Sequence, residues 1–177
     1  MNNVRRPFQW PLRFEASVTD TTIVSSILLE AAAWLQARGK PMWRDDELSA
    51  ERIATEIADG LYFVAEIENE VAGTVRYQLS DSIFWPDTPG DDAAYVHRLA
   101  VRRRYAGREI STALLRWAVE RTASLGRRFV RLDCEAERAP LRDFYERFGF
   151  NYHSEGQVGP YYVVRYEYAV DDGKKKP

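Results

Sequence analysis

The order in which strand-like and helix-like hydrophobic patterns follow one another constrains the fold of this chain more than any other feature. Apolar residues recur at helical spacing in four segments and at alternate or consecutive positions in seven others. The expected helices cover residues 21–39, 49–60, 108–126 and 140–148, and the expected strands cover residues 14–18, 61–67, 71–79, 94–101, 129–134, 152–157 and 161–170. This order predicts an α/β fold with a mixed, mainly antiparallel central sheet and helices on both faces.

The length of the chain favours a single domain. It has 177 residues, of which 45% are hydrophobic, and this is enough apolar material for one core. No linker, repeat or low-complexity segment interrupts the pattern. We therefore expect one domain over residues 1–177, with loose ends at 1–12 and 171–177.

Charge and cysteine content exclude several classes of protein. The chain has 25 Lys and Arg against 27 Asp and Glu, so bulk charge does not favour binding to nucleic acid or to a membrane surface. No apolar run is long enough for a spanning helix. Cys134 is the only cysteine, which rules out an intramolecular disulfide and a cysteine zinc cluster. We expect a cytoplasmic protein with no metal and no nucleic-acid or membrane partner.

The segment from Leu99 to Leu115 has the clearest chemical content. A strand leads through a basic turn, Arg102 to Gly107, into the start of a long helix. The first amides of a helix have no partner within the helix, and together with the helix dipole they suit a phosphate or pyrophosphate group. Four arginines, at 102, 103, 104 and 108, would add charge-assisted contacts. The alternative is that these arginines form an ordinary solvated turn.

This segment resembles the coenzyme A motif of the Gcn5-related N-acetyltransferase (GNAT) superfamily, Q/R-x-x-G-x-G/A between a strand and a helix. In this resemblance Ala106 occupies the position of the usual Gln or Arg, while Glu109 and Ser111 occupy those of the two stricter glycines. Gly107 retains the less strict glycine. The resemblance implies acetyl-CoA as acyl donor, and the residues it places at the cofactor are Leu99, Ala100, Val101, Arg104, Ala106, Gly107, Arg108, Glu109, Ile110, Ser111, Thr112 and Arg138. A carboxylate at Glu109 would repel the pyrophosphate.

A second resemblance lies in residues 141–150, LRDFYERFGF, which is similar to the GNAT signature of an aromatic pair followed by x-x-x-G-F. In that family the tyrosine protonates the departing thiolate of coenzyme A, a role that falls here on Tyr145. The alternative is a buried tyrosine that only packs its helix on the sheet. Arg138 occupies the position of an asparagine that is common in the family.

The resemblance implies that an amine attacks the thioester directly, so that the protein must orient the reactants and remove a proton. His97 is the candidate base because histidine titrates near neutral pH and this one lies two residues before Leu99, on the same strand face. A hydrogen-bonded core histidine is equally compatible with the sequence. The other candidates are Glu66, Asp81, Asp133, Glu135 and a chain of waters. Cys134 as a nucleophile would need a lowered thiol pKa.

The acceptor is not specified by these motifs. The loop at residues 85–92 and the aromatic residues Trp34, Trp43, Phe84 and Trp85 are candidate walls of an acceptor pocket, and ordinary edge packing explains them equally well. We expect acetyl transfer to a primary amine on a small molecule or peptide, and a homodimer by resemblance to the family. The alternatives are a GNAT-fold protein that binds an acyl-CoA without transferring the acyl group and, more remotely, a small nucleic-acid-binding module.

Overall fold

The structure is a computed structural model that describes residues 16–88 and 90–170. Within these residues the chain forms two compact units, and each is described by itself. The first unit consists of residues 16–74 and 100–113, and the second of residues 75–99 and 114–170. The expectation of one domain over residues 1–177 stays a prediction, and the expected loose ends lie outside the described residues.

Six strands form one sheet in the order β1-β2-β3-β4-β6-β5. Their bounds are β1 Tyr62–Ile67, β2 Glu70–Gln78, β3 Ala93–Val101, β4 Phe129–Glu135, β5 Asn151–Val158 and β6 Tyr161–Ala169. β3 and β4 run parallel, whereas β6 is antiparallel to both β4 and β5. The turn between β1 and β2 has positive φ at both Glu68 (52°) and Asn69 (65°), as two-residue hairpin turns require. The predicted mixed α/β class is confirmed.

The first unit packs two helices and β1 around an apolar core. Helix α1 covers Thr21–Gln36 and α2 covers Ala50–Ala58. The side chain of Ser49 caps α2 by accepting a hydrogen bond from the Arg52 amide, at 3.3 Å. The fully or almost fully buried members of this core include Val24, Ile27, Leu28, Ile53, Ile57, Tyr62 and Val64.

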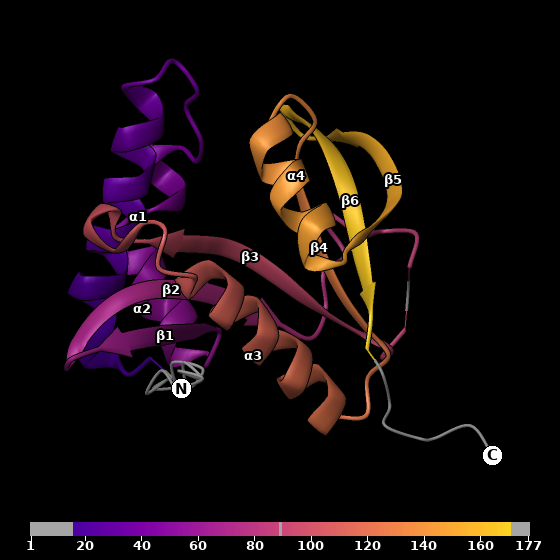
Figure 1. Cartoon of the computed structure of the whole chain (residues 1–177), viewed down its shortest axis with the longest axis horizontal. Coiled ribbons are helices and arrows are strands. Elements are labelled where there is room, and N and C mark those ends of the chain that lie inside the picture. The colour runs from indigo at the N-terminus through magenta and orange to yellow at the C-terminus, as the bar shows by residue number, and fades with distance from the viewer. Residues whose placement is uncertain (1–15, 89, 171–177) are drawn as a thin grey trace, which may run out of the picture. The chain divides into compact units, whose positions relative to one another are not determined.

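The second unit is built on β4, β6 and helix α4, which covers Ala139–Phe148 (Figure 1). The hydroxyl of Tyr166 on β6 fixes this helix, because it donates to Glu146 at 2.7 Å and accepts from Arg142 at 3.0 Å. The ring of Tyr145 lies 6.2 Å from the ring of Tyr166. Helix α3, Ile110–Ser124, begins in the first unit and continues into the second.

A buried arginine on β4 links this strand to β6 and β3 within the second unit. Arg131 on β4 is 6% exposed and donates to Glu167 on β6 at 2.8 Å and to the Tyr95 hydroxyl at 3.3 Å. Its guanidinium also lies 5.3 Å from the centre of the Trp85 ring. A charge this deeply buried is tolerated because it is both paired and hydrogen-bonded.

The expected strand at residues 14–18 is wrong where the structure describes it. Residues 16 and 17 have no strand conformation, and Val18–Asp20 form a single 3-10 turn. The Asp20 carboxylate accepts from the Ser17 amide at 2.7 Å and from the Ser17 hydroxyl at 2.9 Å, which closes the turn. Residues 14 and 15 lie outside the described part of the chain.

Candidate active site

A cluster of three ionisable side chains lies where the parallel pairing of β3 with β4 ends. The parallel register runs from Ala93 opposite Phe129 to Val96 opposite Leu132. His97 and Asp133 are the next residues on the two strands, so they are neighbours at this point. Arg98 then takes a left-handed conformation, with φ of 49°, which interrupts the extended backbone of β3.

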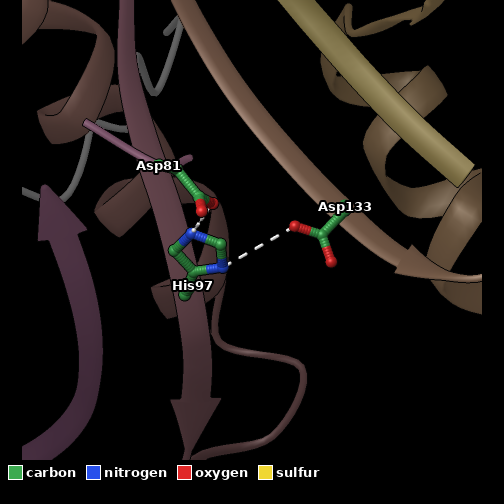
Figure 2. Close-up of side chains that lie close together, drawn as sticks. All are labelled: Asp81, His97 and Asp133. Atoms are coloured by element: carbon green, nitrogen blue, oxygen red, sulfur yellow. Dashed lines mark ion pairs between the residues drawn. The ribbon is translucent and has the colours of Figure 1, made fainter. Parts of the chain in front are cut away.

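The imidazole of His97 lies between two carboxylates (Figure 2). Its Nε2 is 2.9 Å from Oδ2 of Asp81, and its Nδ1 is 3.7 Å from Oδ1 of Asp133. The side chains of His97, Asp81 and Asp133 are 13%, 3% and 9% exposed, respectively. The Gln78 amide nitrogen lies 3.3 Å from the same Nε2, and the Phe84 ring is 5.7 Å from the imidazole.

The two carboxylates differ in their electrostatics. Burial disfavours ionisation of Asp81, but the hydrogen bond and charge of His97, with the backbone amides of Phe84 and Ile83, lower the pKa of Asp81 below its ordinary value. Burial raises the pKa of Asp133 to about 6, and the charge of Asp81 adds to the rise while His97 and Arg165 oppose it. Asp81 is therefore an anion at neutral pH, whereas Asp133 titrates at about pH 6.

Among the described residues, the same three side chains are also the only group with the spacing of a metal site. Each offers one ligand atom, and these atoms lie within 4.8 Å of one another. However, the two carboxylates face opposite nitrogens of the ring, and a metal ion is bound along the lone pair of only one nitrogen. The geometry is that of an imidazole between two carboxylates rather than that of three ligands around one ion.

Tyr145 lies inside the second unit and is 6% exposed. Its ring contacts those of Phe150 and Tyr166, with centroids 5.9 and 6.2 Å away. Burial, reinforced by the nearby Cys134 and Asp133, raises the pKa of the Tyr145 hydroxyl well above its ordinary value. Burial also raises the pKa of the Cys134 thiol to about 12, which is the opposite of what a nucleophilic cysteine needs.

The basic turn lies in the first unit, and most of its arginines have partners there. Arg102 donates to Glu30 at 3.1 Å and to the Ser26 hydroxyl at 2.6 Å. Arg104 pairs with Glu70 at 2.6 Å. The guanidinium of Arg103 stacks 3.9 Å from the ring centre of Trp34. The positive charge of the turn is thus partly neutralised, which the sequence did not reveal.

The start of helix α3 has the backbone form of an anion site. The first helical hydrogen bond runs from the Ala113 amide to the Glu109 carbonyl, so the amides of Ile110, Ser111 and Thr112 precede it. Gly107 and Glu109 both have positive φ, at 79° and 58°. Glu109 therefore has the left-handed conformation that a glycine adopts without strain, at the position where the motif has its first glycine.

The larger part of the sequence matches one family of enzymes. The family model described as "Acetyltransferase (GNAT) family" matches residues 28–150. An uncharacterized N-acetyltransferase, YesJ of Bacillus subtilis, is 30% identical over 139 residues, which cover 75% of this chain and 77% of that protein. The chain belongs to the GNAT acetyltransferase family.

Solved GNAT structures agree with the fold. PaiA N-acetyltransferase from Thermoplasma acidophilum, in complex with coenzyme A, has a TM-score of 0.71 at 17% identity, and the match covers 91% of this chain and 100% of that one. YncA from Salmonella typhimurium, a putative acetyltransferase with its cofactor acetyl-CoA, has a TM-score of 0.70 at 14% identity, covering 96% and 99%. At these identities the likeness shows the fold.

The structure places the GNAT motif residues in three groups. Leu99, Ala100 and Val101 form the end of β3, and Arg104 to Thr112 form the turn and the first turn of α3. Arg138 precedes α4 and donates to both oxygens of Glu135 at 3.2 Å. Arg138 is thus engaged within the protein.

The aromatic residues expected to line an acceptor pocket lie in different parts of the structure. Phe84 lies beside His97, as described above, but Trp85 is 3% exposed and packs on Tyr95 in the core. Trp34 and Trp43 belong to the first unit, where Trp43 packs against the apolar core. Sequence reasoning named Asp81 and Asp133 only as alternative bases. It did not find their contact with His97, because that contact depends on the register of two strands distant in sequence.

Proposed function

We propose that this GNAT chain transfers the acetyl group of acetyl-CoA to a primary amine by direct attack, and that the cluster of Asp81, His97 and Asp133 receives the ammonium proton. The observation that carries the proposal is the position of a half-buried histidine between two carboxylates at the end of the β3–β4 pairing. A cluster with a group that titrates near pH 6 is suited to acid–base chemistry.

The reaction balances with one proton released. The ammonium loses a proton to the cluster, and the amine lone pair attacks the thioester carbon. The C–N bond forms, and collapse of the tetrahedral intermediate breaks the C–S bond, whose electron pair leaves on sulfur. Nitrogen loses a second proton as the amide forms, and sulfur gains one, so that coenzyme A departs as a thiol. The proton held by the cluster then passes to solvent.

Tyr145 is proposed as the donor to the departing sulfur. Its raised pKa keeps the hydroxyl protonated at any working pH, which a donor requires. Since this pKa lies above that of a thiol, the hydroxyl first donates a hydrogen bond to the developing thiolate. The hydroxyl then gives its proton to the sulfur and takes up the proton that the nitrogen loses as the amide forms.

The turn from Arg104 to Thr112 is proposed to bind the pyrophosphate of acetyl-CoA through the first amides of α3. The coenzyme A and acetyl-CoA present in two structural relatives support this assignment. Leu99, Ala100 and Val101 would offer backbone groups to the pantetheine arm, and Arg138, at the motif position of a common asparagine, would contact the same arm. The cytoplasmic location, the absence of a metal and the homodimer stay predictions.

The test begins with calorimetric binding of acetyl-CoA and a thiol-release assay over a panel of primary amines. The Tyr145→Phe variant keeps the ring and removes the donor. We expect kcat to fall by about 10²–10⁴-fold, with acetyl-CoA affinity and Tm near those of the wild type. A lower Tm with little change in kcat would instead assign Tyr145 to packing. Tight binding of acetyl-CoA with no turnover of any amine would contradict the proposed transfer.

A further inference from the structure

Both ring nitrogens of His97 already face a carboxylate. Nε2 is 2.9 Å from Asp81 and Nδ1 is 3.7 Å from Asp133 (Figure 2). A general base must come within hydrogen-bonding reach of the proton that it removes. His97 could meet an acceptor directly only if one carboxylate moved away. A carboxylate on either side of His97 needs no such movement.

The two carboxylates beside His97 are not equivalent. Asp81 is 3% exposed. Its Oδ1 accepts hydrogen bonds from the backbone amides of Ile83, at 3.2 Å, and Phe84, at 3.0 Å. Its Oδ1 is therefore held by the backbone, whereas its Oδ2 faces Nε2 of His97 as an ion pair at 2.9 Å. This anchoring fixes the orientation of the ring and favours a proton on Nε2.

Asp133 is held much less firmly. Its side chain is 9% exposed, and its Oδ1 is buried without a hydrogen-bond partner among the described residues, since 3.7 Å to Nδ1 is too long for a hydrogen bond. Figure 2 shows the second oxygen of Asp133 pointing away from the imidazole. A buried acceptor without a partner is costly to the fold, and a catalytic role is one reason for a protein to keep it.

The geometry points to Asp133 as the group that takes the proton from the acceptor, with His97 and Asp81 as positioning residues behind it. This inference rests on the proposed function. The ammonium N–H bond breaks, its electron pair stays on nitrogen, and the proton bonds to the Asp133 oxygen that points away from the ring. The carboxylic acid holds this proton while its other oxygen still faces Nδ1 of His97 at 3.7 Å, and it loses the proton to solvent after the product leaves.

Charged and titratable groups from several elements surround Asp133. His97 approaches from β3, Asp81 from the loop after β2, Arg165 from β6 and Tyr145 from α4. Arg165 lies opposite Asp133 in the register of β4 and β6, and its guanidinium donates to the Phe84 carbonyl and, at 3.4 Å, to the Ser154 hydroxyl. Burial and Asp81 raise the pKa of Asp133, while His97 and Arg165 oppose the rise, and the result is a carboxyl that titrates at about 6.

The first test measures kcat/KM against pH, by thiol release, with the amine of the panel that the wild type acetylates fastest. We expect an acid limb near pH 6 in the wild type. Asp133→Asn should remove this limb and lower kcat by about 10²-fold or more. His97→Gln should keep the limb, shifted upward because the opposing charge is gone, with a smaller loss of rate. Asp143→Asn, which removes an exposed carboxylate from α4, is the matched control and should behave as the wild type.

Two further measurements guard against a misfolded variant. Formate should restore part of the rate of Asp133→Ala, because it supplies the missing carboxylate, and it should not affect the control. NMR of ¹³C-labelled aspartate carboxyl groups reports the ionisation of Asp133 without turnover. The Asp133 signal is assigned by its absence from Asp133→Asn. It should titrate with a pKa of about 6, and His97→Gln should shift that pKa upward.

The outcomes separate the inference from the proposed function. If His97→Gln removes the acid limb while Asp133→Asn keeps it, His97 is the direct base and the inference is wrong. An Asp133 carboxyl signal with no inflection near pH 6 would also overturn it. A wild type that binds acetyl-CoA but acetylates no amine would defeat the proposed function instead, and in that case the NMR result still decides whether Asp133 titrates near pH 6.

Discussion

Glu109 combines two unfavourable features at one residue. Its φ of 58° is left-handed, which strains a residue with a Cβ, and its carboxylate lies in the turn proposed to bind a pyrophosphate. The side chain is exposed, so packing offers little compensation. The strain and the charge can be separated by substitution.

We expect Glu109→Gly to raise the free energy of unfolding by about 1 kcal/mol, because glycine relieves the left-handed strain. It should also tighten acetyl-CoA binding by up to about fivefold, because a repulsion of up to about 1 kcal/mol is removed. Glu109→Gln is the matched control, since it removes the charge and keeps the strain. Urea denaturation and calorimetry measure the two effects. If neither variant binds acetyl-CoA more tightly, Glu109 does not oppose the cofactor.

The raised pKa of Asp133 has a consequence for stability. A carboxyl whose pKa rises from 3.8 to about 6 on folding favours the folded state fully below about pH 4. That contribution is lost as the pH rises through 6. The lowered pKa of Asp81 has the opposite sign, because its contribution is present above 3.8 and is lost as the pH falls.

Asp133→Asn should therefore be more stable than the wild type at pH 7, by up to about 3 kcal/mol, and no more stable at pH 4. The asparagine keeps the shape of the side chain and cannot ionise. Denaturant unfolding of both proteins at the two pH values measures the difference. An equal difference at pH 4 and pH 7 would mean that Asp133 does not titrate between them.

At the scale of elements, helix α4 depends on how it ends. Gly149 terminates it with φ of 117°, and its amide donates to the Tyr145 carbonyl at 3.2 Å and to the Glu146 carbonyl at 3.1 Å. A Cβ added at Gly149 would lie 3.1 Å from Cε2 of Tyr168. The next residue, Phe150, packs its ring against that of Tyr145.

Gly149→Ala should cost about 2–3 kcal/mol of stability, because both the backbone conformation and the Tyr168 contact become unfavourable. Gly126→Ala is the control, since Gly126 also has positive φ, 69°, but nothing lies within 4 Å of an added Cβ. It should cost about 1 kcal/mol. Equal losses in the two variants, measured by urea unfolding, would show that the Tyr168 contact adds nothing.

Most elements could be predicted from the sequence because each is encoded locally. The α4 pattern with Pro140 near its start and Gly149 at its end gave its bounds within one residue. Register between distant segments is not encoded in this way. The pairing of Val96 with Leu132 brings His97 beside Asp133, and the buried pair of Arg131 and Glu167 depends on the β4–β6 register. These contacts carry much of the candidate site, and no local pattern announces them.

At the scale of the whole molecule, three elements belong to both units. β2, β3 and α3 each cross from one unit to the other, since the divisions fall between residues 74 and 75, 99 and 100, and 113 and 114. Unfolding one unit alone would break a strand or helix within its own length. The units are therefore not expected to unfold independently.

We expect one cooperative thermal transition, in which the calorimetric enthalpy equals the van't Hoff enthalpy. Such a transition would also support the prediction of a single domain. Far-UV circular dichroism and tryptophan fluorescence should give the same midpoint. Two resolved transitions, or a calorimetric enthalpy well above the van't Hoff value, would contradict this expectation.

The stacking around Trp34 gives the molecule an internal optical probe. Arg38 and Arg103 lie 4.0 and 3.9 Å from the centre of its ring, and Arg103 is part of the basic turn. Indole emission responds to the charges beside the ring, so a ligand that draws Arg103 toward its phosphates changes the light that Trp34 emits. Occupancy of the turn can thus be followed without a label and without knowledge of the acceptor, with Trp34→Phe as the spectral blank.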